Sequence, residues 1–146
     1  MDAAVALGVP AWAVLAVPLA VAALLDLRER RLPNALAAVI ACAAAALSYL
    51  TAGWQTLLVH ALMALAVCGA LFGFELGWRQ ANHEAGLGMG DLKALFSLML
   101  LDPWGGLFTF AFSLFAMAVS GVIMGRRALP LLPFIFIVWM VMGAMG

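Results

Sequence analysis

Charged residues are scarce in this chain. Asp, Glu, Lys and Arg make up only 10% of its 146 residues, whereas 68% are hydrophobic, and the mean hydropathy is +1.17. A water-soluble globular domain of this size could not cover so much apolar surface with so few polar side chains. The composition therefore excludes a soluble protein and predicts an integral membrane protein. Because the chain is short, we expect residues 1–146 to form one compact membrane domain with no separate soluble domain.

Cysteine is also rare, and this excludes some kinds of site. Cys42 and Cys68 each lie in an apolar run and lack the paired CxxC spacing of a structural zinc site. They are most simply small buried hydrophobic residues, and they imply neither a disulfide nor a cellular compartment. We expect no metal, no cofactor and no nucleic-acid partner.

Six apolar runs are predicted to form an all-α bundle of six transmembrane helices. The first is long enough to cross a hydrocarbon core of about 30 Å, and the residue before it, Asp2, does not supply the basic start of a cleavable signal peptide. The fourth is short unless part of the preceding loop is also buried among its neighbours. Turns are expected at 51–55 and 102–106. The six runs are residues 3–25, 35–50, 56–78, 91–101, 107–124 and 129–142.

The basic residues predict the orientation of this bundle. With six spans, every Lys and Arg lies in or beside the loops of one side, and the other two loops and both termini have none. Because basic residues gather on the cytoplasmic side, we expect both termini to face the other side. The seven residues are Arg28, Arg30, Arg31, Arg79, Lys93, Arg126 and Arg127.

A glycine-rich stretch, residues 86–93, interrupts the apolar sequence and carries Asp91 and Lys93. Its glycines permit positive φ and close approach of another backbone. Asp91 would lie at or near a helix N-terminus, where an Asp is often only an N-cap. On the six-span topology Asp91 would lie at the same depth as Asp26, which ends the first predicted helix.

Paired carboxylates at a membrane boundary are candidates for function, because burying each one costs free energy. One alternative is that both are solvated interface residues, paired with Arg28 and Lys93. Two Asp residues at the same depth also suit aspartic proteolysis, in which one carboxylate activates a water and the other carboxyl group, protonated, polarises the scissile carbonyl.

Two motifs together resemble the signature of type IV prepilin peptidases, membrane aspartyl proteases of the GxGD class. They are Asp26-Leu-Arg-Glu-Arg-Arg-Leu-Pro-Asn34 and Gly88-Met-Gly-Asp-Leu-Lys93, and residues 128–134 resemble the proline-bracketed start of the family's last helix. The resemblance implies that Asp26 and Asp91 are catalytic. It also implies supporting roles for the other motif residues, which are Pro33, Asn34, Gly88, Gly90 and Lys93.

The first loop, residues 27–34, has no cysteine, so the chain is most similar to the short, peptidase-only form associated with tight-adherence or Flp pilus systems. This resemblance implies a multi-pass protein of the bacterial inner membrane. It would remove the basic leader of prepilin or pseudopilin substrates on the cytoplasmic side, with the apolar substrate helix lying between its own helices in the lipid bilayer.

Other polar residues and other functions stay open at this stage. Glu75 could face the site or bind the basic leader, or it could pair with Arg79 at i+4. Lys93 could orient Asp91 or hold substrate, and His60 is expected to be an interfacial polar residue. One alternative function is a small proton or cation carrier that uses Asp26, Asp91 and Glu75 as a relay, and another is a non-catalytic subunit of a secretion complex.

Overall fold

The computed structural model describes residues 8–84 and 86–146, and all regular structure in these ranges is helical. Three helices, α2, α3 and α5, are long and apolar enough to cross a membrane, and α6 is a shorter apolar helix. The all-α class predicted from the sequence is therefore confirmed. The described helices are α2 (Ala11–Glu29), α3 (Asn34–Asn82), α4 (Met89–Leu101), α5 (Pro103–Met124) and α6 (Leu132–Met145).

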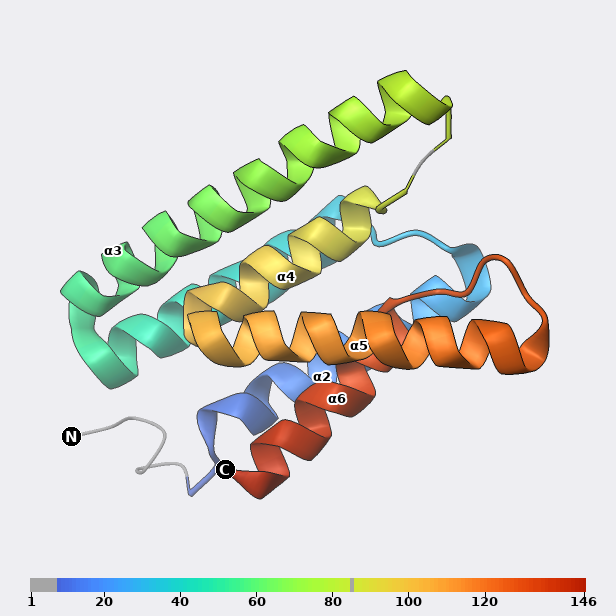
Figure 1. Ribbon diagram of the computed structural model, residues 1–146. Helices are drawn as coiled ribbons and strands as arrows, with labels where there is room; N and C mark the ends of the chain where they lie inside the picture. The colour runs from blue at the N-terminus through green and yellow to red at the C-terminus, as the bar shows by residue number, and fades with distance from the viewer. Residues whose placement is uncertain (1–7, 85) are drawn as a thin grey trace.

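Helix α3 turns back on itself and forms two arms (Figure 1). The bend falls at Gly53, whose backbone has φ 84° and ψ 174°, a conformation that is essentially restricted to glycine. The two arms correspond to the second and third apolar runs of the sequence. The turn expected over residues 51–55 is thus reduced to one residue that departs from helical geometry.

Several helix ends differ from those expected. The first apolar run begins outside the described residues. Within them, the helix of this run is α2, which starts at Ala11, after Pro10. It continues beyond Asp26 to Glu29, so Asp26 lies in its last turn. The turn predicted at 102–106 is wrong, because α5 already begins at Pro103. Proline suits the first turn of a helix because the N–H groups there have no partner within the helix, so its missing N–H costs no hydrogen bond.

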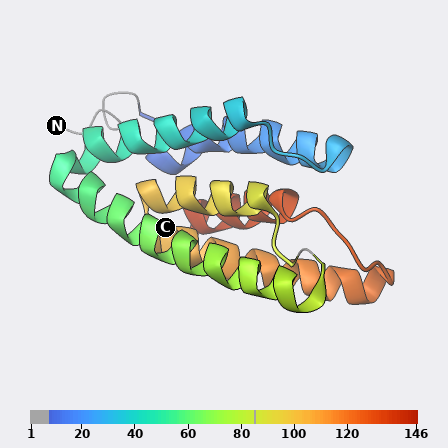
Figure 2. The same ribbon diagram turned by 90° about the horizontal axis from the view of Figure 1, so that it is seen from above.

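Figures 1 and 2 show that the α2–α3, α3–α4 and α5–α6 connections lie toward one end of the molecule. The bend of α3 and the junction between α4 and α5 lie toward the other end. After α5, the chain runs back along the molecule before α6 begins. The connections that carry or adjoin the basic residues are therefore gathered at one end.

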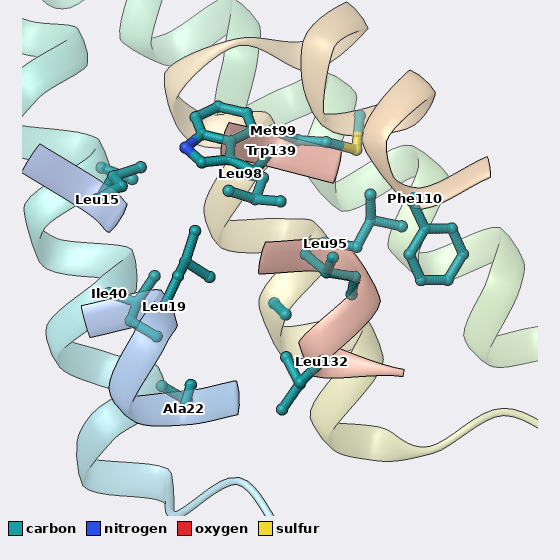
Figure 3. Packing of buried hydrophobic residues seen from close by; sticks show 14 of the residues in the cluster. Leu15, Leu19, Ala22, Ile40, Leu95, Leu98, Met99, Phe110, Leu132 and Trp139 are labelled. Carbon is teal, nitrogen blue, oxygen red and sulfur yellow. The ribbon is translucent and has the colours of Figure 1, made fainter. Parts of the chain in front are cut away.

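Helix α4 is the centre of the packing. Its side chains are buried on nearly every face, which is typical of a helix surrounded by others. Figure 3 shows Leu95 and Leu98 of α4 pointing into the core with Leu19 of α2 and Leu132 of α6. Because α4 is covered by its neighbours, its 13 residues do not need to span a bilayer on their own.

Candidate active site

Asp26 and Asp91 line the same small cavity, of about 170 Å³. Asp26 comes from the last turn of α2 and Asp91 from the first turn of α4, so two helices that are far apart in sequence bring the carboxylates together. Arg30 lines the cavity too, and residues 128–131, which directly precede α6, complete its lining. The structure thus places the two predicted catalytic residues together.

Asp26 is also tied to the last helix. Its side chain is buried, with 8% of its surface exposed, and Oδ2 accepts a hydrogen bond of 3.2 Å from the backbone N–H of Leu132, the first residue of α6. The first N–H groups of a helix have no partner within the helix, and a carboxylate there interacts favourably with the helix dipole. This contact fixes Asp26 and the start of α6 relative to each other.

Asp91 is the third residue of α4. Helix α4 begins at Met89 and has Gly88 as its N-cap residue, so the interpretation of Asp91 as an N-cap is wrong. The backbone N–H groups of Asp91 and Leu92 both bond to the carbonyl of Gly88, at 3.1 and 3.3 Å. The position of Asp91 therefore follows directly from where α4 starts.

The glycines beside Asp91 allow close approach, not positive φ. Neither Gly88 nor Gly90 has a positive φ, so of the two possibilities only close approach applies to them. A Cβ atom on Gly88 would lie 2.9 Å from the Asp91 carboxylate oxygen, and a Cβ on Gly90 would lie 3.1 Å from Cβ of Leu32. Gly88 leaves room for the carboxylate, and Gly90 lets the first loop pack against α4.

The two sequence motifs are joined by a side-chain hydrogen bond. The ammonium group of Lys93 donates to the carboxamide oxygen of Asn34, the first residue of α3, which follows the N-cap residue Pro33. Lys93 and Asn34 line a separate, largely apolar cavity of about 610 Å³. Lys93 thus holds the start of α3 against α4, and it does not line the cavity that contains Asp91.

One alternative paired Asp26 with Arg28 and Asp91 with Lys93, and neither ion pair forms in the part of the chain that the structure describes. Among the residues that the structure describes, neither Asp26 nor Asp91 forms an ion pair. The basic residue that shares their cavity is Arg30, whose left-handed backbone (φ 53°) ends α2, and not Arg28. The interpretation of the two aspartates as interface residues paired with Arg28 and Lys93 is therefore wrong.

The family model described as the type IV leader peptidase family matches residues 13–146. The chain belongs to this family. No curated protein and no solved structure matched it. Family membership, together with the apolar helices, makes this leader peptidase a membrane protein of the prepilin peptidase type.

Two further polar residues of the leader peptidase lie away from the aspartate cavity. Glu75 is almost fully buried and forms the expected ion pair with Arg79, at 2.7 Å, but it also accepts two hydrogen bonds from the glycine-rich loop. His60, expected to be an interfacial polar residue, approaches the carbonyl of Leu100 in α4 at 3.1 Å through Nδ1.

The sequence did not reveal three of the contacts that shape the site. The bond from Leu132 to Asp26 joins residues 106 positions apart, and a backbone donor leaves no signal in the residue type. Arg30 could not be distinguished from its neighbours Arg28 and Arg31 without the fold. The loop bonds of Glu75 were missed because its i+4 partner already explained the residue.

Proposed function

We propose that this chain is an aspartic endopeptidase that removes the basic leader of type IV prepilin-like substrates, with Asp26 and Asp91 as its catalytic pair. The observation that carries the proposal is their shared cavity, in a chain of the type IV leader peptidase family. Two carboxyl groups on one small cavity provide the acid and the base that amide hydrolysis requires.

In this mechanism one carboxylate is ionised and the other carries a proton. The ionised group removes a proton from a water as that water attacks the scissile carbonyl carbon. The protonated group donates its proton to the carbonyl oxygen. When the tetrahedral intermediate breaks down, the carboxyl group that took the water's proton donates it to the departing amine. The other carboxylate accepts a proton from a hydroxyl of the intermediate, so the pair returns to one ionised and one protonated group. Two carboxyl groups therefore complete the cycle without a further catalytic side chain.

The proposal includes the placement of the protein in the bacterial inner membrane. We take residues 1–146 as a single six-span domain with both termini on the non-cytoplasmic side and cleavage on the cytoplasmic side. Support comes from the connections that carry or adjoin the basic residues, which lie toward one end of the molecule (Figure 1). Asp26 and Asp91 lie close to the helix ends that face those connections. The partner is a prepilin or pseudopilin, whose leader would reach the cavity from the cytoplasm.

We favour the peptidase over the relay alternative. A proton or cation path needs polar groups distributed across the bilayer. Glu75, the third carboxylate of that relay, does not line the cavity of Asp26 and Asp91. Both of its oxygens accept hydrogen bonds from Arg79 or from the loop.

The test is to co-express a prepilin-like reporter, with a basic leader that ends in glycine before an apolar helix, and to measure its mass. We expect wild type to remove the leader, and Asp26→Asn and Asp91→Asn each to abolish removal while the protein still reaches the membrane. Asp102→Asn is the matched control, because Asp102 lies at the opposite end of α4. Normal processing by either active-site variant would remove that residue from the mechanism. Processing that none of the variants reduces would overturn the aspartic mechanism.

A further inference from the structure

The loop ahead of Asp91 is anchored by a buried carboxylate outside the catalytic cavity. Glu75 lies in the second arm of α3 and is only 2% exposed. One of its oxygens accepts the backbone N–H of Gly86 at 3.0 Å and the Nε–H of Arg79 at 2.7 Å. The other accepts the N–H of Leu87 at 2.7 Å. Hydrogen bonds to a charged acceptor are about twice as strong as neutral ones, so this anchor is firm.

The anchored residues directly precede the start of α4. Leu87 is followed by Gly88, the N-cap residue, and the Asp91 N–H is bonded to the Gly88 carbonyl. A shift of the loop at Leu87 would therefore move the first turn of α4. Since Asp91 lies in that turn, its carboxylate would move within the shared cavity.

Gly86 shows that the loop must pass close to Glu75. A Cβ atom at this position would lie 3.1 Å from Oε2 of Glu75 and 3.1 Å from Cδ1 of Trp78. Both distances are tighter than nine in ten real Cβ contacts, so a methyl group here requires Glu75, Trp78 or the loop to shift by a few tenths of an ångström. The first glycine of the stretch is thereby explained by Glu75 and not by the aspartates.

We propose that Glu75 is a positioning residue that sets the start of α4, and thereby the place of Asp91 relative to Asp26. An ion pair with Arg79 alone would need neither burial nor contact with the loop amides. The proposal rests on the proposed peptidase function for its activity readout, and a second, structural readout is independent of that function.

The activity test compares variants of the purified full chain in detergent, with the prepilin-like reporter as the substrate. Glu75→Gln retains size but turns one acceptor oxygen into a donor, so at least one of the two loop bonds is lost. We expect kcat to fall on the order of 100-fold, as for a misplacement of about 1 Å, while KM changes little because the substrate contacts remain. Gly86→Ala should produce the same pattern, and Glu75→Gln with Gly86→Ala should cost little more than either alone, because both act on one contact.

Two controls separate positioning from stability. Arg79→Gln removes the ion pair but leaves both loop bonds, and Arg79 is 44% exposed, so kcat should stay within about fivefold of wild type. Gly73→Ala places a Cβ in open space in the same helix and should leave kcat unchanged. If Arg79→Gln lowers kcat as much as Glu75→Gln, the ion pair and not the loop anchor is responsible, and the proposal is overturned.

Amide hydrogen exchange provides the readout that does not depend on peptidase activity. In wild type the N–H groups of Gly86 and Leu87 should exchange slowly, and Glu75→Gln should increase their exchange at least tenfold while α2 and α5 stay protected. Unchanged exchange would overturn the anchor even if the reporter is never cleaved. Faster exchange with an unchanged kcat would overturn the positioning role and leave the proposed peptidase function intact.

Discussion

At the scale of single residues, Gly88, the glycine closest to the Asp91 carboxylate, should be sensitive to substitution. Gly88 has φ −73° and ψ 143°, which alanine adopts without strain. Its replacement by alanine therefore tests only whether there is room for a Cβ atom beside Asp91. Its Cβ would lie 2.9 Å from the Asp91 oxygen and must displace it. We expect Gly88→Ala to lower the rate of leader removal on the order of 100-fold, with an unchanged melting temperature.

Gly90→Ala provides the graded comparison for this prediction. The new methyl group would meet Cβ of Leu32 at 3.1 Å, away from the carboxylate, so the rate should fall less than in Gly88→Ala. Gly77→Ala, which meets nothing within 4 Å, serves as the control. Leader removal at the normal rate by Gly88→Ala would show that Asp91 adapts, and that the glycine is not required for catalysis.

The individual residues of the site could be predicted from the sequence more readily than the contacts between them. Asp26 and Asp91 could be found because they are charged residues in an apolar chain and stand in motifs of a family to which the chain belongs. Lys93 and Asn34 were found as motif residues, but their bond to each other was not. A pairing across 59 residues depends on how α3 and α4 pack, and no local pattern encodes that packing.

At the scale of elements, helix existence was easier to predict than helix ends. The apolar runs correspond to α2, the two arms of α3, α4, α5 and α6. The predicted helix ends are wrong where one residue type occurs in two kinds of local structure. The sequence around Pro103 predicts a turn, but proline at the first position of a helix has the same sequence pattern. Only the packing of α5 against α4 decides between them.

The bend of α3 leads to a prediction about stability. Gly53 has a backbone conformation essentially restricted to glycine, and a Cβ atom there would meet nothing within 4 Å. Gly53→Ala should therefore cost about 1–3 kcal/mol through backbone strain alone. Gly69→Ala, also in open space but with helical backbone, should instead stabilise by up to about 1 kcal/mol. Unfolding of the purified protein in detergent measures both. Equal effects of the two replacements would contradict the strained bend.

At the scale of the whole molecule, the arrangement of the helices and the distribution of charge favour the same orientation in the membrane. The connections α2–α3, α3–α4 and α5–α6 lie toward one end (Figure 2), and they carry or adjoin the basic residues. Within a membrane, packing rather than water exclusion holds helices together, so the apolar outer faces of α5 and α6 can remain exposed to lipid. The fold therefore suits a chain embedded with its basic end in the cytoplasm.

This topology predicts the location of reporters fused along the chain. Fusions after Arg31, Asn82 and Arg127 should report a cytoplasmic location, because each lies at the end that carries the basic residues. Fusions after Gly53 and Asp102 should report the opposite side, because the bend of α3 and the α4–α5 junction lie at the other end (Figure 1). Asp26 and Asp91 would then meet at the cytoplasmic end, where a prepilin leader is accessible before export. A cytoplasmic signal at Gly53 would mean that α3 does not cross the membrane twice. The two carboxylates would still share their cavity, but leader removal on the cytoplasmic side would lose its structural basis.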